Sequence, residues 1–432
     1  MMRAVTPAGH GGPALRLVGG SHWPPAVHGS IVGCIGWVSV SVIATLAGIG
    51  LIGLILVDAF ETVILPRRVT RRFRLTRVIV LNSWRVWVRV ARLLPSTSGR
   101  EGAGKREGFL GAFGPLSLLM LLGIWASGLV VGFGLLYWGS GTPLGGPDPH
   151  PGLGPTLYLS GETFFTIGFG DLAPRAGLGR FLAVAEGATG FSFLAVIIAY
   201  LPVIFTAYSQ RETRITLLDA RAGSPPTAAA FLARQEPGPA PFDCDVYLRE
   251  WEVWTAELLE IHLSLPILTT WRSQHDRQSW LGALTLILDT TALVIVGLET
   301  SAGRVPGRQA RVTFAMARHA VGDLCQILVA EPRDPADDRL PTPDLERLRE
   351  HLAAAGIALR PGQAATDQLI ALRQLYEPYV TALAARLMVA VPTWLPAANA
   401  QDDWETTAWQ WDPEVARTAV RGPHEAGVST TD

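Results

Sequence analysis

Three long apolar stretches constrain the fold of this 432-residue chain more than any other feature of its sequence. Residues 31–57 and 109–138 contain no charged side chain, and the third stretch, residues 178–208, contains none from Gly187 onward. About 20 apolar residues in a helix span the hydrocarbon core of a bilayer. The sequence therefore predicts three transmembrane helices. A purely soluble protein is excluded, because 49% of the residues are apolar and only 17% are charged, against about 25% in soluble domains.

The charges between these stretches predict how the chain crosses the membrane. Residues 58–108 hold 12 basic and 4 acidic side chains, whereas residues 139–177 hold one basic and three acidic ones. Because basic loops stay in the cytoplasm, we expect a multi-pass protein of the cell membrane with its N-terminus outside and its C-terminal domain inside. The basic segment at 67–106 is expected to lie on the bilayer and attract anionic lipids. The net charge of −1 predicts no nucleic-acid partner.

Beyond the third stretch, the sequence predicts a helical cytoplasmic domain whose partner it does not name. The apolar run at 281–298 contains Asp289, and a carboxylate in mid-membrane costs at least about 2.5 kcal/mol, so we interpret this run as a buried helix. Helical periodicity covers residues 243–396 without an alternating strand pattern. The helices expected there span residues 246–263, 278–299, 308–331, 343–355 and 364–391. Irregular segments are expected at 1–30 (a disordered N-terminus), 221–242 (a linker) and 397–432 (a flexible tail).

A short motif with two glycines lies between the second and third stretches. Residues 166–171 read TIGFGD. Gly168 and Gly170 accept positive φ at little cost, so the carbonyl groups of such a strand can all face one side. Non-helical backbone is tolerated at membrane depth only where it is buried in protein or lines a polar path. A ring of such strands would replace the water shell of a potassium ion with carbonyl oxygens. These oxygens would belong to Thr166, Ile167, Gly168 and Phe169.

This motif resembles the selectivity filter of the potassium-channel family, T-[VI]-G-[YF]-G-D, and Gly179-Arg180 also matches that family. The resemblance covers residues 109–210. It implies K⁺ as the permeant ion, no cofactor, and a filter that Glu162 and Thr163 support. Phe169 stands where tyrosine is commonest, so a bracing phenolic hydroxyl is missing. The elements implied are an outer helix at 109–138, a pore helix at 155–165, the filter at 166–171 and an inner helix at 178–208.

The acidic residues near the motif each allow two interpretations. Glu162 and Asp171 fall where some members of the family pair two carboxyl groups behind the filter, and the alternative is two solvated side chains. Glu186 lies in an apolar stretch, where an acid is costly. It is either a functional group that bonds the pore helix or attracts ions, or a satisfied structural hydrogen-bonding partner.

The predicted inner helix also carries residues with two interpretations. Gly190 falls where the family has its hinge glycine, and the alternative is close packing against the pore helix. Phe191, Leu194 and Ile198 follow at helical spacing. They either line the cavity and the inner constriction or make ordinary helix contacts.

Together these features predict an all-α membrane protein: a potassium-channel pore domain with one extra N-terminal transmembrane helix and an α-helical cytoplasmic domain. One pore loop cannot enclose an ion, so a homotetramer is expected. The expected function is that of a bacterial-type potassium channel subunit with passive conduction. Two alternatives stay open: a weakly selective cation channel, and a membrane-anchored regulatory or scaffold protein with a vestigial pore. We expect no enzyme, because the sequence shows no nucleophile–base pair or metal cluster.

Overall fold

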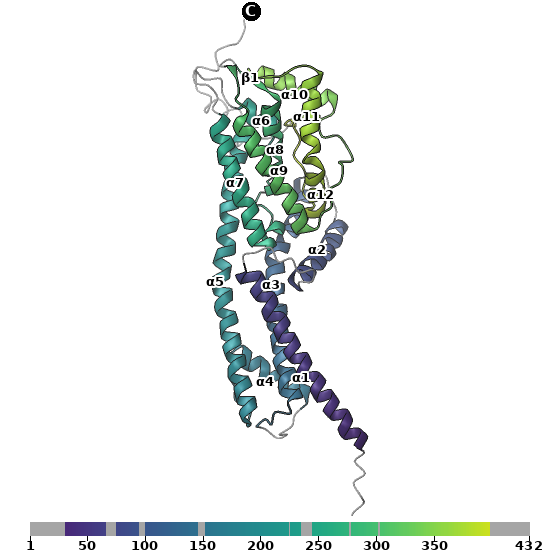
Figure 1. Cartoon of the computed structure of the whole chain (residues 1–432), viewed down its shortest axis with the longest axis vertical. Coiled ribbons are helices and arrows are strands. Elements are labelled where there is room, and N and C mark those ends of the chain that lie inside the picture. Colours follow the sequence, from purple (N-terminus) through teal and green to yellow (C-terminus); the bar gives the residue numbers. More distant parts are fainter. Residues whose placement is uncertain are drawn as a thin grey trace, which may run out of the picture.

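The molecule is elongated, with a bundle of long helices at one end and a compact domain of shorter helices at the other (Figure 1). Its computed structural model describes residues 31–65, 75–94, 100–145, 152–223, 225–234, 244–275, 278–300 and 303–397. The N-terminus and the tail that the sequence predicts to be unstructured lie outside these ranges, apart from residue 397. The fold is that of an all-α membrane protein, as predicted.

Three helices are long and apolar enough to cross a membrane: α1 (Ile31–Ala59), α3 (Arg100–Gly139) and α5 (Gly177–Ala222). They contain the three predicted stretches, but two of them are longer than predicted. The outer helix α3 begins before residue 109, and the inner helix α5 continues past residue 208. The extension of α5 buries one face, which carries Arg211, Glu212 and Asp219 as well as apolar residues. Ile215 and Leu218 are buried in the core of the C-terminal domain, so packing continues the helix beyond its apolar span.

Small residues let α1 and α3 pack closely side by side. A Cβ on Gly132 of α3 would lie 2.6 Å from Ile52, and one on Gly48 of α1 would lie 2.7 Å from the carbonyl oxygen of Gly132. Gly128 and Gly132 form the small-xxx-small spacing that brings membrane helices together. The extra N-terminal helix is therefore attached to the outer helix of the predicted pore domain.

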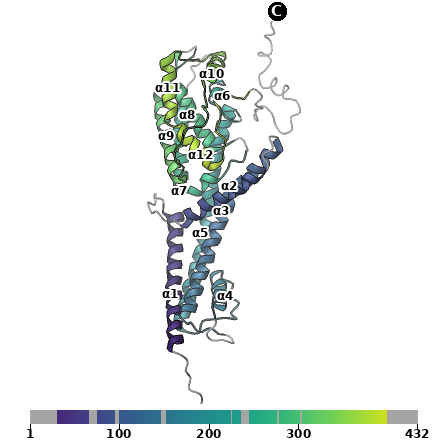
Figure 2. The ribbon, with the colours of Figure 1, turned by 90° about the vertical axis from the view of Figure 1, so that its right-hand side faces the viewer.

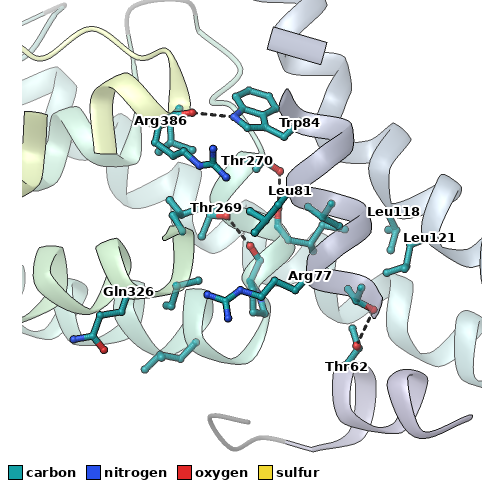
Figure 3. Close-up of a pocket in the computed structure, with 18 of the residues that line it drawn as sticks. Thr62, Arg77, Leu81, Trp84, Leu118, Leu121, Thr269, Thr270, Gln326 and Arg386 are labelled. Carbon is teal, nitrogen blue, oxygen red and sulfur yellow. Dashed lines mark hydrogen bonds between the residues drawn. The ribbon is translucent and has the colours of Figure 1, made fainter. Parts of the chain in front are cut away.

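The helix α2 (Leu75–Leu93) crosses between the two parts of the molecule (Figure 2). It follows a short π-helical turn, η1 (Phe60–Ile64), at the end of α1. The buried carboxylate of Asp58 joins three elements here. It accepts hydrogen bonds from the backbone N–H of Thr76 at 3.1 Å and from Nε1 of Trp125 at 3.0 Å. The exposed arginines of α2 are Arg77 (Figure 3), Arg85, Arg89 and Arg92.

The C-terminal domain surrounds one predominantly apolar helix. Helix α8 (Trp280–Val296) is buried on all sides, which confirms the buried helix predicted at 281–298. Its one carboxylate, Asp289, pairs with Arg339 at 2.7 Å and accepts a hydrogen bond from the hydroxyl of Tyr376. The elements around it are α6 (Ala228–Ala233), α7 (Cys244–Ser264), η2 (Pro266–Thr270), β1 (Leu298–Thr300), β2 (Gly303–Arg304), α9 (Arg308–Leu328), α10 (Thr342–Ala354), β3 (Ala358–Leu359), α11 (Gln363–Gln374) and α12 (Glu377–Leu387).

Three predictions for this region need correction. The domain contains a small antiparallel sheet in the order β2-β1-β3, whose strands of two or three residues are too short to show alternation. The helix predicted at 364–391 is two helices, because Pro378 lacks a backbone N–H and disfavours a helical preceding residue. The linker predicted at 221–242 contains the buried helix α6. Its first turn is capped by the Thr227 side chain, which accepts from the N–H of Ala230 at 3.2 Å.

The C-terminal domain packs against the ends of α3 and α5 that lie nearest to it. Arg211 of α5 is buried and donates to the carbonyl oxygens of Leu268 and Trp271, each at 2.8 Å. Trp271 packs so tightly on α3 that Gly114 has no room for a side chain. Arg272 also forms an ion pair with Glu107 of α3. The domain therefore contacts the outer and the inner helix together.

Candidate pore and filter

A short helix positions the TIGFGD strand. Helix α4 (Leu153–Phe164) occupies the place of the predicted pore helix at 155–165 and leads directly into the strand. Its last carbonyl groups accept from the first amides that follow. The N–H of Thr166 donates to Thr163 at 3.1 Å, and the N–H of Ile167 donates to Glu162 at 2.8 Å. These bonds fix the direction in which the strand leaves the helix.

The strand has positive φ at every second residue. The φ values are 54° at Thr166, 65° at Gly168 and 78° at Gly170. The sequence predicts this for the two glycines. It does not predict it for Thr166, because a β-branched residue with positive φ is strained by about 1–2 kcal/mol. Ile167 and Phe169 lie between these positions with exposed side chains. No partner strand covers this segment in the described part of the chain.

The two acidic residues at the ends of this segment lie in different surroundings. Glu162 is buried behind the strand, whereas Asp171 is exposed at its far end. No hydrogen bond joins their carboxylates among the described residues. Asp171 instead accepts from the hydroxyl of Tyr158 at 3.3 Å. Thr163 is half-buried and contacts the strand through its backbone carbonyl.

Glu186 is the centre of a buried hydrogen-bond network that joins three helices. The hydroxyl of Tyr137 in α3 donates to its Oε2 at 2.9 Å, and its Oε1 is hydrogen-bonded to the hydroxyl of Ser160 in α4. Oγ of Ser160 also lies 2.7 Å from the carbonyl oxygen of Val130. Glu186 thus bonds the short helix α4 and has a hydrogen bond at each carboxyl oxygen, which fits both interpretations of this residue. Sequence reasoning missed Tyr137 and Ser160, although each is a polar residue in an apolar helix.

Gly190, for which the sequence allows a hinge or close packing, packs closely against the end of α4 in this structure. A Cβ on Gly190 would overlap the carbonyl oxygen of Phe164, at the end of α4. Helix α5 continues through this position without a break. Phe191, Leu194 and Ile198 are each more than half exposed. Most of the apolar surface of these three side chains is therefore uncovered in a single chain.

A short helix, a strand with alternating φ and a long helix packed behind them define the pore of an ion channel. A family described as "Ion channel" matches residues 150–207, and the chain belongs to this family through its pore domain. It is 33% identical to Protein LctB of Geobacillus stearothermophilus over 93 residues, which cover 19% of this chain and 69% of that protein. Protein LctB of Bacillus caldotenax matches to the same extent.

A longer similarity extends beyond the pore domain. The chain is 23% identical over 263 residues to the uncharacterized membrane protein YdjJ of Bacillus subtilis (strain 168). This match covers 58% of the chain and 72% of that protein. No solved structure matches significantly.

Proposed function

We propose that the chain is a subunit of a potassium-selective channel that conducts passively. The alternating φ of residues 166–170, held at the end of α4, is the observation that carries this proposal. It allows the carbonyl groups of Thr166, Ile167, Gly168 and Phe169 to face one axis and coordinate dehydrated K⁺. The C-terminal end of α4 adds roughly half a negative charge, which favours a cation nearby.

The proposed assembly is a homotetramer around this axis. One strand cannot enclose an ion, and identical subunits that form a closed ring repeat the same contact. Uncovered apolar side chains support such an assembly. Phe169 is 71% exposed in a single chain and Phe191 is 68% exposed, and such a face is costly unless lipid or another subunit covers it. The filter would lie on the axis, with α1 on the outside.

The proposed orientation follows from the distribution of basic residues. The segment that contains α2 is rich in arginine, so it belongs on the cytoplasmic side of the cell membrane. In this proposed orientation the N-terminus lies outside and the C-terminal domain lies in the cytoplasm. The exposed arginines of α2 would then face the headgroups of the inner leaflet, where each basic residue contributes about 1 kcal/mol to binding anionic lipid.

A pair of glycine variants tests the proposed filter. Both Gly168 and Gly123 have open space where a Cβ would lie, but only Gly168 has positive φ. We expect Gly168→Ala to lower K⁺ flux into liposomes at least about tenfold. Alanine with positive φ strains the strand by about 1 kcal/mol or more in each of the four proposed subunits. Gly123→Ala on α3 should conduct as the wild type does. Unchanged flux in Gly168→Ala would contradict the proposed filter.

The weakly selective cation channel is the second candidate, and Phe169 favours it. The side chain carries no hydroxyl that could hold the strand from behind. Reversal potentials in mixed K⁺ and Na⁺ separate the two candidates. A potential near the K⁺ equilibrium value supports selectivity, whereas a value between the two supports the weakly selective pore. Absence of flux under every condition would support the scaffold alternative.

A further inference from the structure

Glu186 is a fully buried acid on α5 that lies in apolar surroundings. The helices that hydrogen-bond it are α3 and α4. Residues 109–139 of α3 carry no charge, and the one charged residue of α4 is Glu162, which is also an acid. The nearest basic residue along α5, Arg180, is exposed six positions earlier. Because a buried ionised carboxylate is costly unless a cation pairs with it, these surroundings favour a neutral side chain.

The hydrogen bonds of Ser160 indicate where a proton lies. Its Oγ is hydrogen-bonded to Oε1 of Glu186 and lies 2.7 Å from the carbonyl oxygen of Val130. A serine hydroxyl has one hydrogen to donate, and a carbonyl group can only accept. Both bonds form when Ser160 donates to Val130 and accepts from a protonated Glu186. An ionised Glu186 would leave one of the two oxygen pairs with no hydrogen between them.

The second carboxyl oxygen of Glu186 completes this pattern. Oε2 accepts from the hydroxyl of Tyr137 at 2.9 Å, so one oxygen of the acid accepts and the other donates. Tyr137 is the titratable side chain that α3 places against Glu186. A glutamine side chain offers the same pattern, because its amide oxygen accepts and its NH₂ group donates.

Two contacts hold α4 on α5. Ser160 of α4 is hydrogen-bonded to Glu186, and the carbonyl group of Phe164 lies against Gly190. Four residues separate the two contacts on each helix, so about one turn of α4 lies against one turn of α5. Phe164 is the last residue of α4. The bond to Glu186 therefore holds the helix whose end sets the direction of the TIGFGD strand.

We propose that Glu186 carries a proton and, by donating it to Ser160 in a hydrogen bond, acts as a positioning residue for the filter. The bonds run from Glu186 through Ser160 to Val130 and join the inner helix, the pore helix and the outer helix. The effect on the filter rests on the proposed function, whereas the proton does not. In this role Glu186 holds α4 and does not attract ions.

Infrared spectroscopy of the full-length protein in detergent tests the proton. The spectrum of the wild type minus that of Glu186→Gln isolates the vibrations of this carboxyl group. We expect the difference at neutral pH to show the band of a protonated carboxylic acid. The control, Glu257→Gln, changes an acid whose side chain is 48% exposed, and it should remove the bands of an ionised carboxylate. Loss of ionised-carboxylate bands in Glu186→Gln as well would overturn the proposal.

Potassium flux into liposomes tests the positioning role. Glu186→Gln keeps an acceptor for Tyr137 and a donor for Ser160, so we expect flux within about twofold of the wild type. Glu186→Ala removes both bonds, so flux should fall about tenfold or more. The control is Thr189→Val, which should conduct as the wild type does, because the Thr189 hydroxyl donates to Ala185 of its own helix at 2.7 Å. An equal fall in the glutamine and alanine variants would show that conduction needs the charge of Glu186, and would contradict the positioning role.

The two experiments keep the two proposals apart. Absence of flux in the wild type would refute the channel, and the infrared difference would still decide whether Glu186 carries a proton. Thermal unfolding in detergent checks that Glu186→Ala is folded. If it is not, the glutamine variant decides alone: flux near the wild-type value supports the positioning role, and a tenfold loss overturns it.

Discussion

Gly190 shows how the absence of one side chain sets the position of the pore helix. Its backbone lies against the carbonyl group of Phe164, at the point where α4 ends and the strand begins. Any side chain here would push the end of α4 away from α5. The residue therefore acts through close approach of two backbones, one of the general uses of glycine.

We expect Gly190→Ala to destabilise the assembled protein by about 1–3 kcal/mol, the usual cost of overpacking a filled site. Thermal unfolding in detergent measures the loss, and K⁺ flux should fall with it. Gly187→Ala is the matched control on the same helix, because a Cβ there meets no atom within 4 Å. If Gly190→Ala unfolds at the wild-type temperature, close packing is not the reason for this glycine.

At the same scale, the sequence predicts which residues form the candidate filter better than it predicts their supports. Gly168 and Gly170 are identifiable because positive φ is typical of glycine. Thr166 is not, since its conformation is imposed by the hydrogen bonds between backbone groups at the end of α4. The partners of Glu186 were also missed. Tyr137 lies 49 residues before it in the chain, and no local pattern reports a contact of that separation.

Among the elements, η2 connects the C-terminal domain with the inner helix. It is a single short turn, yet its neighbouring carbonyl groups satisfy the buried guanidinium of Arg211. Nε of Arg211 also donates to Glu212 at 3.0 Å. A buried charge of this kind is tolerated only when its hydrogen bonds are complete.

Replacing Arg211 by glutamine should loosen the domain from α5. The change leaves Glu212 and two buried carbonyl groups without their partner, so we expect a loss of about 3–5 kcal/mol. Urea unfolding followed by tryptophan fluorescence measures it. Arg214→Gln is the control, because Arg214 is 45% exposed and lies 4.0 Å from Glu257, a pair worth less than about 1 kcal/mol. Similar losses in both variants would show that η2 does not hold the helix.

The elements themselves were predictable where one physical signal dominates. Helices α1, α3 and α5 follow from charge-free stretches, and α8 follows from an apolar run that contains Asp289. The sequence pattern failed to predict elements whose formation depends on tertiary packing. Helix α6 lies in a Pro/Ala-rich segment whose alanines become buried only when the whole domain has folded, and the strands β1–β3 are too short to have a period.

On the scale of the whole molecule, a buried imidazole makes the free energy of unfolding depend on pH. His262 of α7 lies near Arg211, and burial, followed by the charge of this arginine, lowers the pKa of His262 to about 3. Its Nδ1 lies 2.7 Å from the carbonyl oxygen of Leu258. The ring is therefore neutral in the folded protein, whereas it titrates near its ordinary pKa of about 6.5 once unfolded.

The direction of the pH effect follows from these two values. Below about pH 6.5 the unfolded chain binds a proton that the folded chain does not, so stability falls by up to about 1.4 kcal/mol per pH unit until about pH 3. Urea unfolding at several pH values should show this slope. It should flatten in His262→Phe and persist in His319→Gln, whose imidazole is 63% exposed. An unchanged slope in His262→Phe would assign the acid sensitivity to other groups.

The length and continuity of α5 have a mechanical consequence. Its 46 residues make a rod of about 69 Å, with Gly190 seated on α4 toward one end and Arg211 gripped by the domain toward the other. Pro202 lies between them and leaves the carbonyl of Ile198 without its helical donor. Pro202 is therefore the position at which α5 bends most easily. A rotation of the domain would bend α5 there and leave the part of the helix that packs on α4 in place.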